Sequence, residues 1–223
     1  MKMKKNPIKV VFVGNAGVGK SSLITTFIKD THDPEQNFQI SSDKYKKEIK
    51  VKHNNQTYDL LLEIWNSAGN EKFRNINTIF IKNAEILIFV YDTTNKKSYN
   101  DLKEIWLPSI KKNCDIDKMI KCICANKTDL YENEEVDLNE GKKLKNEIGA
   151  EILVETSIKD FESIESLFQQ IGENYITKLN ENQNVTNLGD KENSQINVKN
   201  NCNLEISEVQ KSKDSCCKHC NIF

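Results

Sequence analysis

Short runs of apolar residues recur along the first 180 residues of the chain and are separated by longer polar stretches. Six runs have the length and the β-branched or aromatic content of strands, and several are apolar throughout, as in strands buried on both faces. The predicted strands are Ile8–Val13, Tyr45–Lys52, Tyr58–Trp65, Ala84–Tyr91, Met119–Ala125 and Ile152–Glu155. Their regular return along the chain indicates one large sheet.

Helical patterns fill most of the intervals between these strands. In them apolar residues recur three and four positions apart, which places them on one face of a helix. The predicted helices are Ser21–Ile28, Ser98–Lys112, Leu138–Ile148 and Ile164–Leu179. This alternation predicts an α/β fold, a mostly parallel six-stranded sheet with helices on both faces, formed by residues 1–180 as one domain.

The last part of the chain, residues 181–223, has a different composition. From Glu181 to Ser215 it is rich in Asn, Lys, Glu and Ser and poor in large apolar residues. Such a segment cannot bury enough apolar surface to offset its loss of conformational entropy. We therefore predict a flexible, disordered C-terminal tail.

Composition and charge narrow the function classes. The formal net charge is −1, and Arg74 is the single arginine among 32 basic residues, so the chain lacks the arginine-rich surface typical of nucleic-acid readers. No apolar run reaches the ~18 residues of a membrane-spanning helix. The seven cysteines are odd in number and unevenly placed, which favours a reduced, cytoplasmic compartment over a disulfide framework.

A glycine-rich loop follows the first predicted strand and matches the pattern G-x-x-x-x-G-K-[ST] from Gly14 to Ser21. This spacing is typical of a P-loop NTPase, because the glycines let backbone N–H groups surround a polyphosphate at a helix N-terminus. Lys20 can reach the β- and γ-phosphates, and the Ser21 hydroxyl can ligate Mg²⁺. The predicted phosphate-binding residues are Asn15, Ala16, Gly17, Val18, Gly19, Lys20, Ser21 and Ser22.

A second motif, Asn126-Lys127-Thr128-Asp129, stands directly after the strand Met119–Ala125. An Asp at that edge can accept hydrogen bonds from the N1–H and the exocyclic amine of guanine. Adenine lacks this donor pair and would leave the carboxylate unpaired, at about 1–3 kcal/mol or more. The motif therefore favours a guanine nucleotide over the more distant alternatives, a P-loop ATPase or a small-molecule kinase.

Together these motifs resemble the Ras-like small GTPases over residues 7–180 and the last few residues. Trp65–Arg74 looks like the Rab form of the segment W-D-T-A-G-Q-E-R-F-R, and Ala84–Asp92 is similar to the strand that follows it in Rabs. The resemblance implies a GTP/GDP switch in vesicle traffic that uses Mg²⁺. It also implies exchange factors, GTPase-activating proteins, effectors, a prenyltransferase and a GDP-dissociation inhibitor as partners.

The same resemblance assigns roles to individual residues. Asn126, Lys127 and Asp129 would hold the guanine together with the backbone at Ser157, Ile158 and Lys159, where the family usually has Ala in place of Ile158. Gly69 would sense the γ-phosphate. The residues expected around Mg²⁺ are Ser21, Asn66 through a water molecule, and Ser41 or its neighbour Ser42.

Three departures from the family pattern fall on the hydrolytic machinery. Asn66 stands where the family has the Asp that holds Mg²⁺ through water, and Asn70 stands where it has the Gln that orients the attacking water. The switch-one Thr is replaced by a serine. Neutral drift explains any one of these changes, but three together predict slow GTP hydrolysis. The alternative is a hydrolysis-deficient guanine-nucleotide-binding interaction module.

Two further features concern surfaces. Tyr45, Trp65 and Phe80 stand where Rabs carry an aromatic triad contacted by effectors, although core packing is nearly as good an explanation for Trp65. At the C-terminus Cys220 heads a C-a-a-X box whose final Phe favours geranylgeranylation, and Cys216 and Cys217 can carry a second lipid. A zinc site is the weaker alternative because the cysteines are too crowded. The predicted location is the cytosolic face of a membrane.

Overall fold

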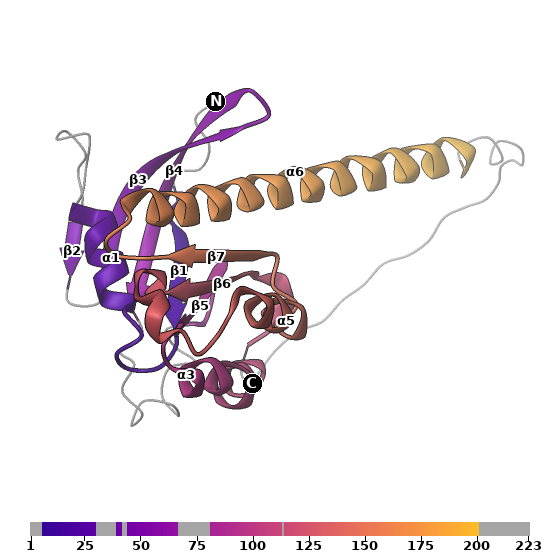
Figure 1. The fold of residues 1–223 in the computed structure, drawn as a ribbon. Helices are drawn as coiled ribbons and strands as arrows, with labels where there is room; N and C mark the ends of the chain where they lie inside the picture. The colour runs from indigo at the N-terminus through magenta and orange to yellow at the C-terminus, as the bar shows by residue number, and fades with distance from the viewer. Residues whose placement is uncertain (1–5, 30–38, 42–43, 67–80, 113, 201–223) are drawn as a thin grey trace, which may run out of the picture. The chain divides into compact units, whose positions relative to one another are not determined.

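The computed structural model describes residues 6–29, 39–41, 44–66, 81–112 and 114–200; for 39–41 and 182–200 it describes the backbone alone. Its centre is one seven-stranded sheet of order β2-β3-β4-β1-β5-β6-β7 (Figure 1). The strands are β1 (Ile8–Val13), β2 (Gln39–Ser41), β3 (Lys44–His53), β4 (Gln56–Asn66), β5 (Ile86–Asp92), β6 (Ile120–Asn126) and β7 (Ile152–Thr156).

The α/β fold predicted from the sequence is confirmed. All six predicted strands are present, and β4, β1, β5, β6 and β7 pair in parallel, while β3 runs antiparallel to β4. The seventh strand, β2, is an addition to the predicted six. It has only three residues, pairs antiparallel with β3 at the sheet edge, and is too short to show an alternating pattern in the sequence.

The helices follow the strands in the expected order, with one irregularity. They are α1 (Lys20–Lys29), α3 (Lys96–Asp101), α4 (Leu107–Lys111), α5 (Leu138–Ile148) and α6 (Phe161–Asn200), with short 3₁₀ turns η3 (Ile116–Lys118) and η4 (Thr128–Asn133). The helix predicted over Ser98–Lys112 is divided by a π-helical turn, η2 (Leu102–Trp106). Asp137 caps α5 by accepting a hydrogen bond from the Glu140 N–H, and Gly149 ends that helix in the left-handed conformation.

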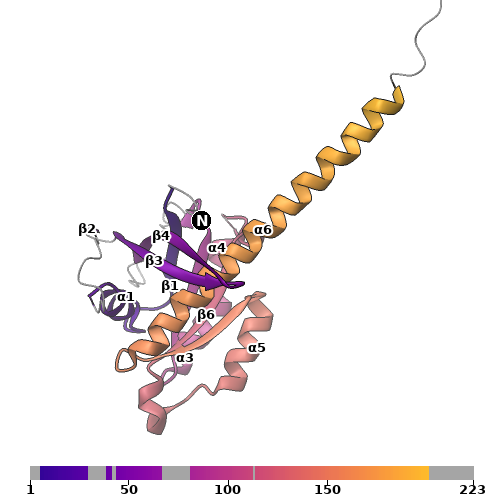
Figure 2. The same ribbon diagram turned by 90° about the horizontal axis from the view of Figure 1, so that it is seen from above.

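Helices cover both faces of the sheet (Figures 1 and 2). On one face α1 and the first part of α6 pack on β1, β4 and β5, and Phe27 of α1 stacks on Phe168 of α6. On the other face lie α3, η2, α4 and α5, with Tyr99, Leu102 and Leu144 in the core. The central strands β5 and β6 are buried along their whole length, which explains why their sequences are apolar on both faces.

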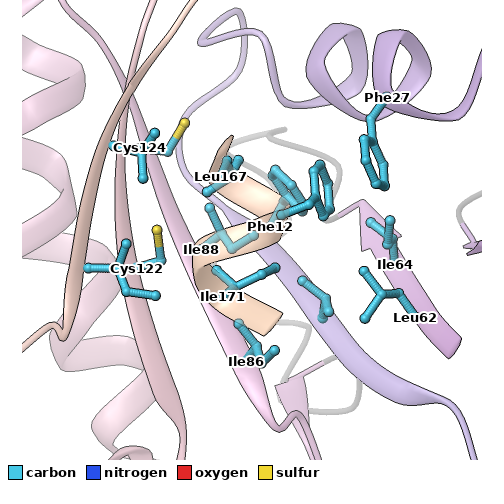
Figure 3. Packing of buried hydrophobic residues seen from close by; sticks show 14 of the residues in the cluster. Phe12, Phe27, Leu62, Ile64, Ile86, Ile88, Cys122, Cys124, Leu167 and Ile171 are labelled. Atoms are coloured by element: carbon cyan, nitrogen blue, oxygen red, sulfur yellow. The ribbon is translucent and has the colours of Figure 1, made fainter. Parts of the chain in front are cut away.

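Cys122 and Cys124 of β6 belong to this core and point to the same side of the strand (Figure 3). Both side chains are fully buried. Burial raises the pKa of both thiols, that of Cys124 to about 12, so neither forms a thiolate near neutral pH. They act as small hydrophobic residues of the core.

The C-terminal part of the chain corrects one expectation. The helix predicted to end at Leu179 continues as α6 to Asn200, beyond the compact unit, which ends at Leu179. The flexibility predicted for the tail stays a prediction. A helix that already exists adds one hydrogen bond for each residue it gains, and the segment contains no proline to stop it. Within the described residues, none of the helices combines the length and the apolar character that crossing a membrane requires.

Candidate nucleotide-binding site

The glycine-rich loop joins β1 to α1, as the motif predicted. Gly14, Gly17 and Gly19 all have positive φ, +143°, +79° and +98°. A Cβ atom on Gly14 would lie 2.2 Å from the carbonyl oxygen of Val90, and one on Gly19 would lie 2.3 Å from Asn126 Nδ2. The loop therefore passes against β5 and β6 so closely that only glycine fits at these two positions.

Lys20 is the first residue of α1 and is buried, with 5% of its surface exposed. Its ammonium group donates hydrogen bonds to the carbonyl oxygens of Gly14 (2.8 Å) and Asn15 (2.7 Å), which lie at the start of the loop. Burial lowers the pKa of Lys20 to about 8. The loop thus curls around one desolvated ammonium group, an arrangement suited to a phosphate anion.

Asn126 connects the phosphate loop to the C-terminal edge of the sheet. Its side-chain Nδ2 donates a 2.8 Å hydrogen bond to the carbonyl oxygen of Val18, and its Oδ1 accepts one from Thr156 Oγ1 at 3.1 Å. Asn126 is 1% exposed, and through these two bonds it joins the phosphate loop to β6 and β7. Thr156 was not singled out in the sequence because a threonine at the end of a strand carries no signal of its own.

Lys127 has a left-handed backbone conformation, φ +69°, and its ammonium group lies 2.6 Å from the carboxylate of Asp92. Asp92 is the last residue of β5 and also accepts hydrogen bonds from the backbone N–H and the hydroxyl of Thr94. Asp92 was not among the site residues predicted from the sequence. Its position at the carboxyl end of a parallel strand, where α/β folds bind ligands, is the signal that could have found it.

Asp129 lies at the start of η4, beside the loop that follows β7. Its carboxylate accepts a 2.7 Å hydrogen bond from Ser157 Oγ and lies 2.8 Å from the ammonium group of Lys159. Hydrogen bonds from Lys159 and then Ser157 hold the pKa of Asp129 below its usual range, so the side chain is a carboxylate at neutral pH. Ile158 is 49% exposed beside them. The two segments predicted to hold the base thus meet in space.

Asn66 lies at the end of β4, beside the first turn of α1. Its Nδ2 donates a 2.8 Å hydrogen bond to Ser21 Oγ. Its Oδ1 is buried and accepts no hydrogen bond within the part of the chain that the structure describes. Two oxygen atoms, the Ser21 hydroxyl and the amide carbonyl of Asn66, are therefore brought together next to the phosphate loop.

Several predicted residues cannot be placed in the same way. Gly69, Asn70 and Phe80 lie outside the described residues, as do Ser42 and the cysteines Cys216, Cys217 and Cys220. Ser41 is described by its backbone only, as the last residue of β2. The roles predicted for all of these residues stay predictions.

The grouping of Tyr45 with Trp65 in one aromatic surface is wrong. Trp65 pairs with Lys44 across β3 and β4, and Tyr45 pairs with Ile64, so the two aromatic side chains point to opposite faces of the sheet. Tyr45 packs against the cluster under α1 and α6, and Trp65 against the cluster under α3 and α5. The sequence placed both residues on strands but did not fix the register between them.

Comparison with known proteins identifies a family and several relatives that this chain resembles. The sequence model of the Ras family matches residues 9–177. The chain is similar to Ras-related protein Rab-18-B of Danio rerio, 34% identical over 166 residues, which are 74% of this chain and 78% of that protein. It is also similar to Ras-related protein Rab-18 of Lymnaea stagnalis, 34% identical over 169 residues, 76% of this chain and 80% of that protein. Rab-18 of Caenorhabditis briggsae is 33% identical over the same length.

Proposed function

The chain belongs to the Ras family of small GTPases, in its Rab branch, and we propose that it is a guanine-nucleotide switch that hydrolyses GTP slowly. Members of this family are GTPases that generally use Mg²⁺. The proposal concerns what this chain's own residues do with the nucleotide and the metal, and how fast the reaction runs.

The base and the phosphates are assigned to two neighbouring parts of the site. We assign guanine recognition to the Asp129 carboxylate. This carboxylate is oriented by hydrogen bonds from Ser157 and Lys159. The phosphates are assigned to the loop amides and to Lys20, whose ammonium group is already directed by two carbonyl oxygens.

The corner formed by Ser21 and Asn66 fits Mg²⁺, which prefers oxygen ligands and is commonly held through water and substrate phosphates. Ser21 Oγ would be a direct ligand and Asn66 Oδ1 an acceptor for a metal-bound water. When bound, Mg²⁺ neutralises charge that develops on the transferred phosphoryl group. Asn66 is neutral, however, and its N–H occupies one lone pair of Ser21 Oγ. A carboxylate would instead accept a hydrogen bond from Ser21.

The neutral amide of Asn66 is the observation that carries the proposal of slow turnover. Two unit charges ~4 Å apart interact by about 4 kcal/mol at an effective dielectric near 20, before water compensates. Because Asn66 is neutral, this attraction to Mg²⁺ is absent. Asn70 is one methylene shorter than Gln, and a displacement of the attacking water by ~1 Å can slow the reaction about a hundredfold.

A single-turnover assay tests the proposal. The protein is loaded with GTP, the reaction is started with Mg²⁺ over a range of concentrations, and released phosphate is measured. Relative to the wild type, Asn66→Asp should lower the Mg²⁺ concentration for half-maximal rate at least about tenfold. Asn70→Gln should raise the rate at saturating Mg²⁺ about tenfold or more.

Two outcomes of this assay would contradict the proposal of slow GTP hydrolysis. If the wild type hydrolyses GTP as fast as the Asn66→Asp/Asn70→Gln double variant, hydrolysis is not slow for the proposed reason. If no variant releases phosphate although GTP stays bound, the chain is the interaction module considered as the alternative. Competition of GTP and ATP for a fluorescent guanine nucleotide checks the base preference in the same preparation.

The switch is proposed to act on membranes in vesicle traffic, with exchange factors, GTPase-activating proteins and effectors as partners. We assign effector contact to the face of Trp65, whose ring lies 4.3 Å from the ammonium group of Lys9 and 4.2 Å from that of Lys44. Attachment is assigned to a prenyl group on Cys220 and a second lipid on Cys216 or Cys217, because a single chain anchors only marginally. Prenyltransferase and GDP-dissociation inhibitor follow as partners of such a tail.

A further inference from the structure

The side chain of Asn15, the second residue of the phosphate loop, is held on both of its polar atoms by the opposite wall of the site. Its Nδ2 donates a 2.7 Å hydrogen bond to Asp101 Oδ2. Its Oδ1 accepts a 2.8 Å hydrogen bond from the indole N–H of Trp106. Both partners lie more than 80 residues away in the sequence, and no motif pointed to either of them.

The π-helical turn η2 explains how two residues five positions apart reach the same side chain. In an α-helix, residues five apart project about 140° away from each other. In η2 the Leu107 N–H bonds to the carbonyl oxygen of Leu102, an i→i+5 bond that brings such residues nearly one above the other. Asp101 directly precedes this turn and Trp106 is its last residue, and both contact Asn15.

Asn15 is also linked to the phosphate-binding lysine. Its carbonyl oxygen, with that of Gly14, accepts the hydrogen bonds of the Lys20 ammonium group. The position of these two carbonyls therefore sets the position of Lys20. Asp101 is 5% exposed, and the ammonium group of Lys97 lies 3.1 Å from Oδ2, the same carboxylate oxygen that accepts the hydrogen bond from Asn15, so the charge of Asp101 is partly compensated by a cation.

We propose that Asn15 is a positioning residue: it anchors the phosphate loop to Asp101 and Trp106, and so holds Lys20 where the nucleotide phosphates bind. The inference rests on nucleotide binding at this loop and adds a role for α3 and η2 in that binding. Loss of the anchor releases the loop carbonyls and with them the ammonium group, so bound nucleotide leaves faster.

An exchange of the Asn15 and Asp101 side chains tests whether Asn15 anchors the phosphate loop. Asn15→Asp places a carboxylate against Asp101, and we expect GDP carrying a fluorescent label to dissociate about tenfold faster or more. Asp101→Asn keeps an acceptor for Asn15 Nδ2, so its rate should stay within about threefold of the wild type. In the Asn15→Asp/Asp101→Asn double variant, the carboxylate introduced into the loop accepts hydrogen bonds from the amide introduced into α3 and from Trp106. The rate should return to within about threefold of the wild type.

This design separates positioning from simple electrostatics. The double variant has the wild-type net charge but carries its carboxylate nearer to the phosphates, so a pure charge effect would leave it as defective as Asn15→Asp. Trp106→Phe keeps the aromatic packing and removes the N–H donor, and it should also speed dissociation. Glu104→Gln, a charge change at an exposed position of the same π-helical turn, serves as the matched control and should match the wild type.

A fluorescence measurement adds evidence of a different kind: a residue with a purely structural role would not respond to the removal of nucleotide. The chain has two tryptophans, so in a Trp65→Phe background Trp106 is the sole emitter. Its fluorescence should change when nucleotide is removed, and Asn15→Ala should abolish that change.

The outcomes are distinguishable from failure of the proposed function. If the wild type does not retain guanine nucleotide, the proposed function fails. If it does, but Asn15→Asp and Trp106→Phe release nucleotide at the wild-type rate, the anchor is overturned. It is equally overturned if the double variant stays as fast as Asn15→Asp. Should Asn15→Asp not fold, Trp106→Phe and the fluorescence measurement decide the question.

Discussion

Lys20 is the residue whose ionisation links the site to pH. Burial lowers its pKa to about 8, so above that pH the nucleotide-free protein has lost most of this positive charge. A phosphate anion beside the amine raises the pKa again. Binding must then take up a proton at high pH, and nucleotide affinity should fall about tenfold between pH 7 and pH 9.

Calorimetry in two buffers of different ionisation enthalpy measures this proton directly. We expect close to one proton taken up per nucleotide at pH 9 and close to none at pH 7. In Lys20→Arg the guanidinium stays charged throughout, so this uptake should vanish, while any titration of the guanine ring remains. Equal proton uptake by the wild type and Lys20→Arg would show that another group is responsible.

For individual residues, the sequence predicted the chemical role of a side chain better than the partners that the side chain contacts. The Lys20 and Asp129 motifs were recognisable because their spacing has one use. The carbonyl partners of Lys20, the Asp92 carboxylate beside Lys127, and the anchoring of Asn15 were not predictable. They depend on which side chains from distant segments meet, which a single sequence does not encode as a local pattern.

At the scale of elements, the site is assembled where strands end and loops begin. The phosphate loop follows β1, Asp92 ends β5, Asn126 ends β6 and Thr156 ends β7. The Asn126 side chain joins three of these elements, because it bonds to Val18 in the phosphate loop and to Thr156 in β7. Removing it should therefore loosen the whole edge and not only the contact with the base.

We predict that Asn126→Ala lowers the free energy of unfolding by about 1–3 kcal/mol, because two buried hydrogen bonds, to Val18 and from Thr156, are lost. Chemical denaturation of the nucleotide-free protein measures the change. Asn146→Ala, the same substitution at an exposed position of α5, is the control and should shift stability by less than about 0.5 kcal/mol. Equal, small effects of the two substitutions would contradict the role of Asn126 as a connector.

Sequence patterns predicted the long elements and missed the short or irregular ones. The apolar strands β5 and β6 and the capped helix α5 lie close to their predicted bounds, since their signals extend over many residues. The three-residue strand β2 has no room for an alternating pattern. The turn η2 needs an i→i+5 bond that a helical period does not reveal, and the end of α6 was placed about twenty residues too early.

At the scale of the whole molecule, the chain divides into a compact unit that ends at Leu179 and a second unit from Asn180 onward. All predicted nucleotide contacts lie in the first unit. Among the side chains that the structure describes, the last core residues of α6 also lie there: Tyr175 and Ile176 are buried, and Leu179 packs against the same cluster. The cysteines proposed to carry lipids lie in the second. This division predicts that nucleotide binding and membrane binding can be separated by cutting the chain.

We predict that a chain shortened to residues 1–180 keeps the nucleotide affinity of the full chain and a free energy of unfolding within about 0.5 kcal/mol of it, because the core residues found among the described side chains are all retained. After incubation with a prenyltransferase and its lipid donor, the full chain should sediment with phospholipid vesicles, whereas the shortened chain should stay in solution. The full-length variant with Cys216, Cys217 and Cys220 replaced by serine tests whether the thiols are responsible. It should fail to sediment while binding nucleotide normally. If it sediments as the wild type does, the membrane contact comes from other residues of the tail, and the lipid assignment is wrong.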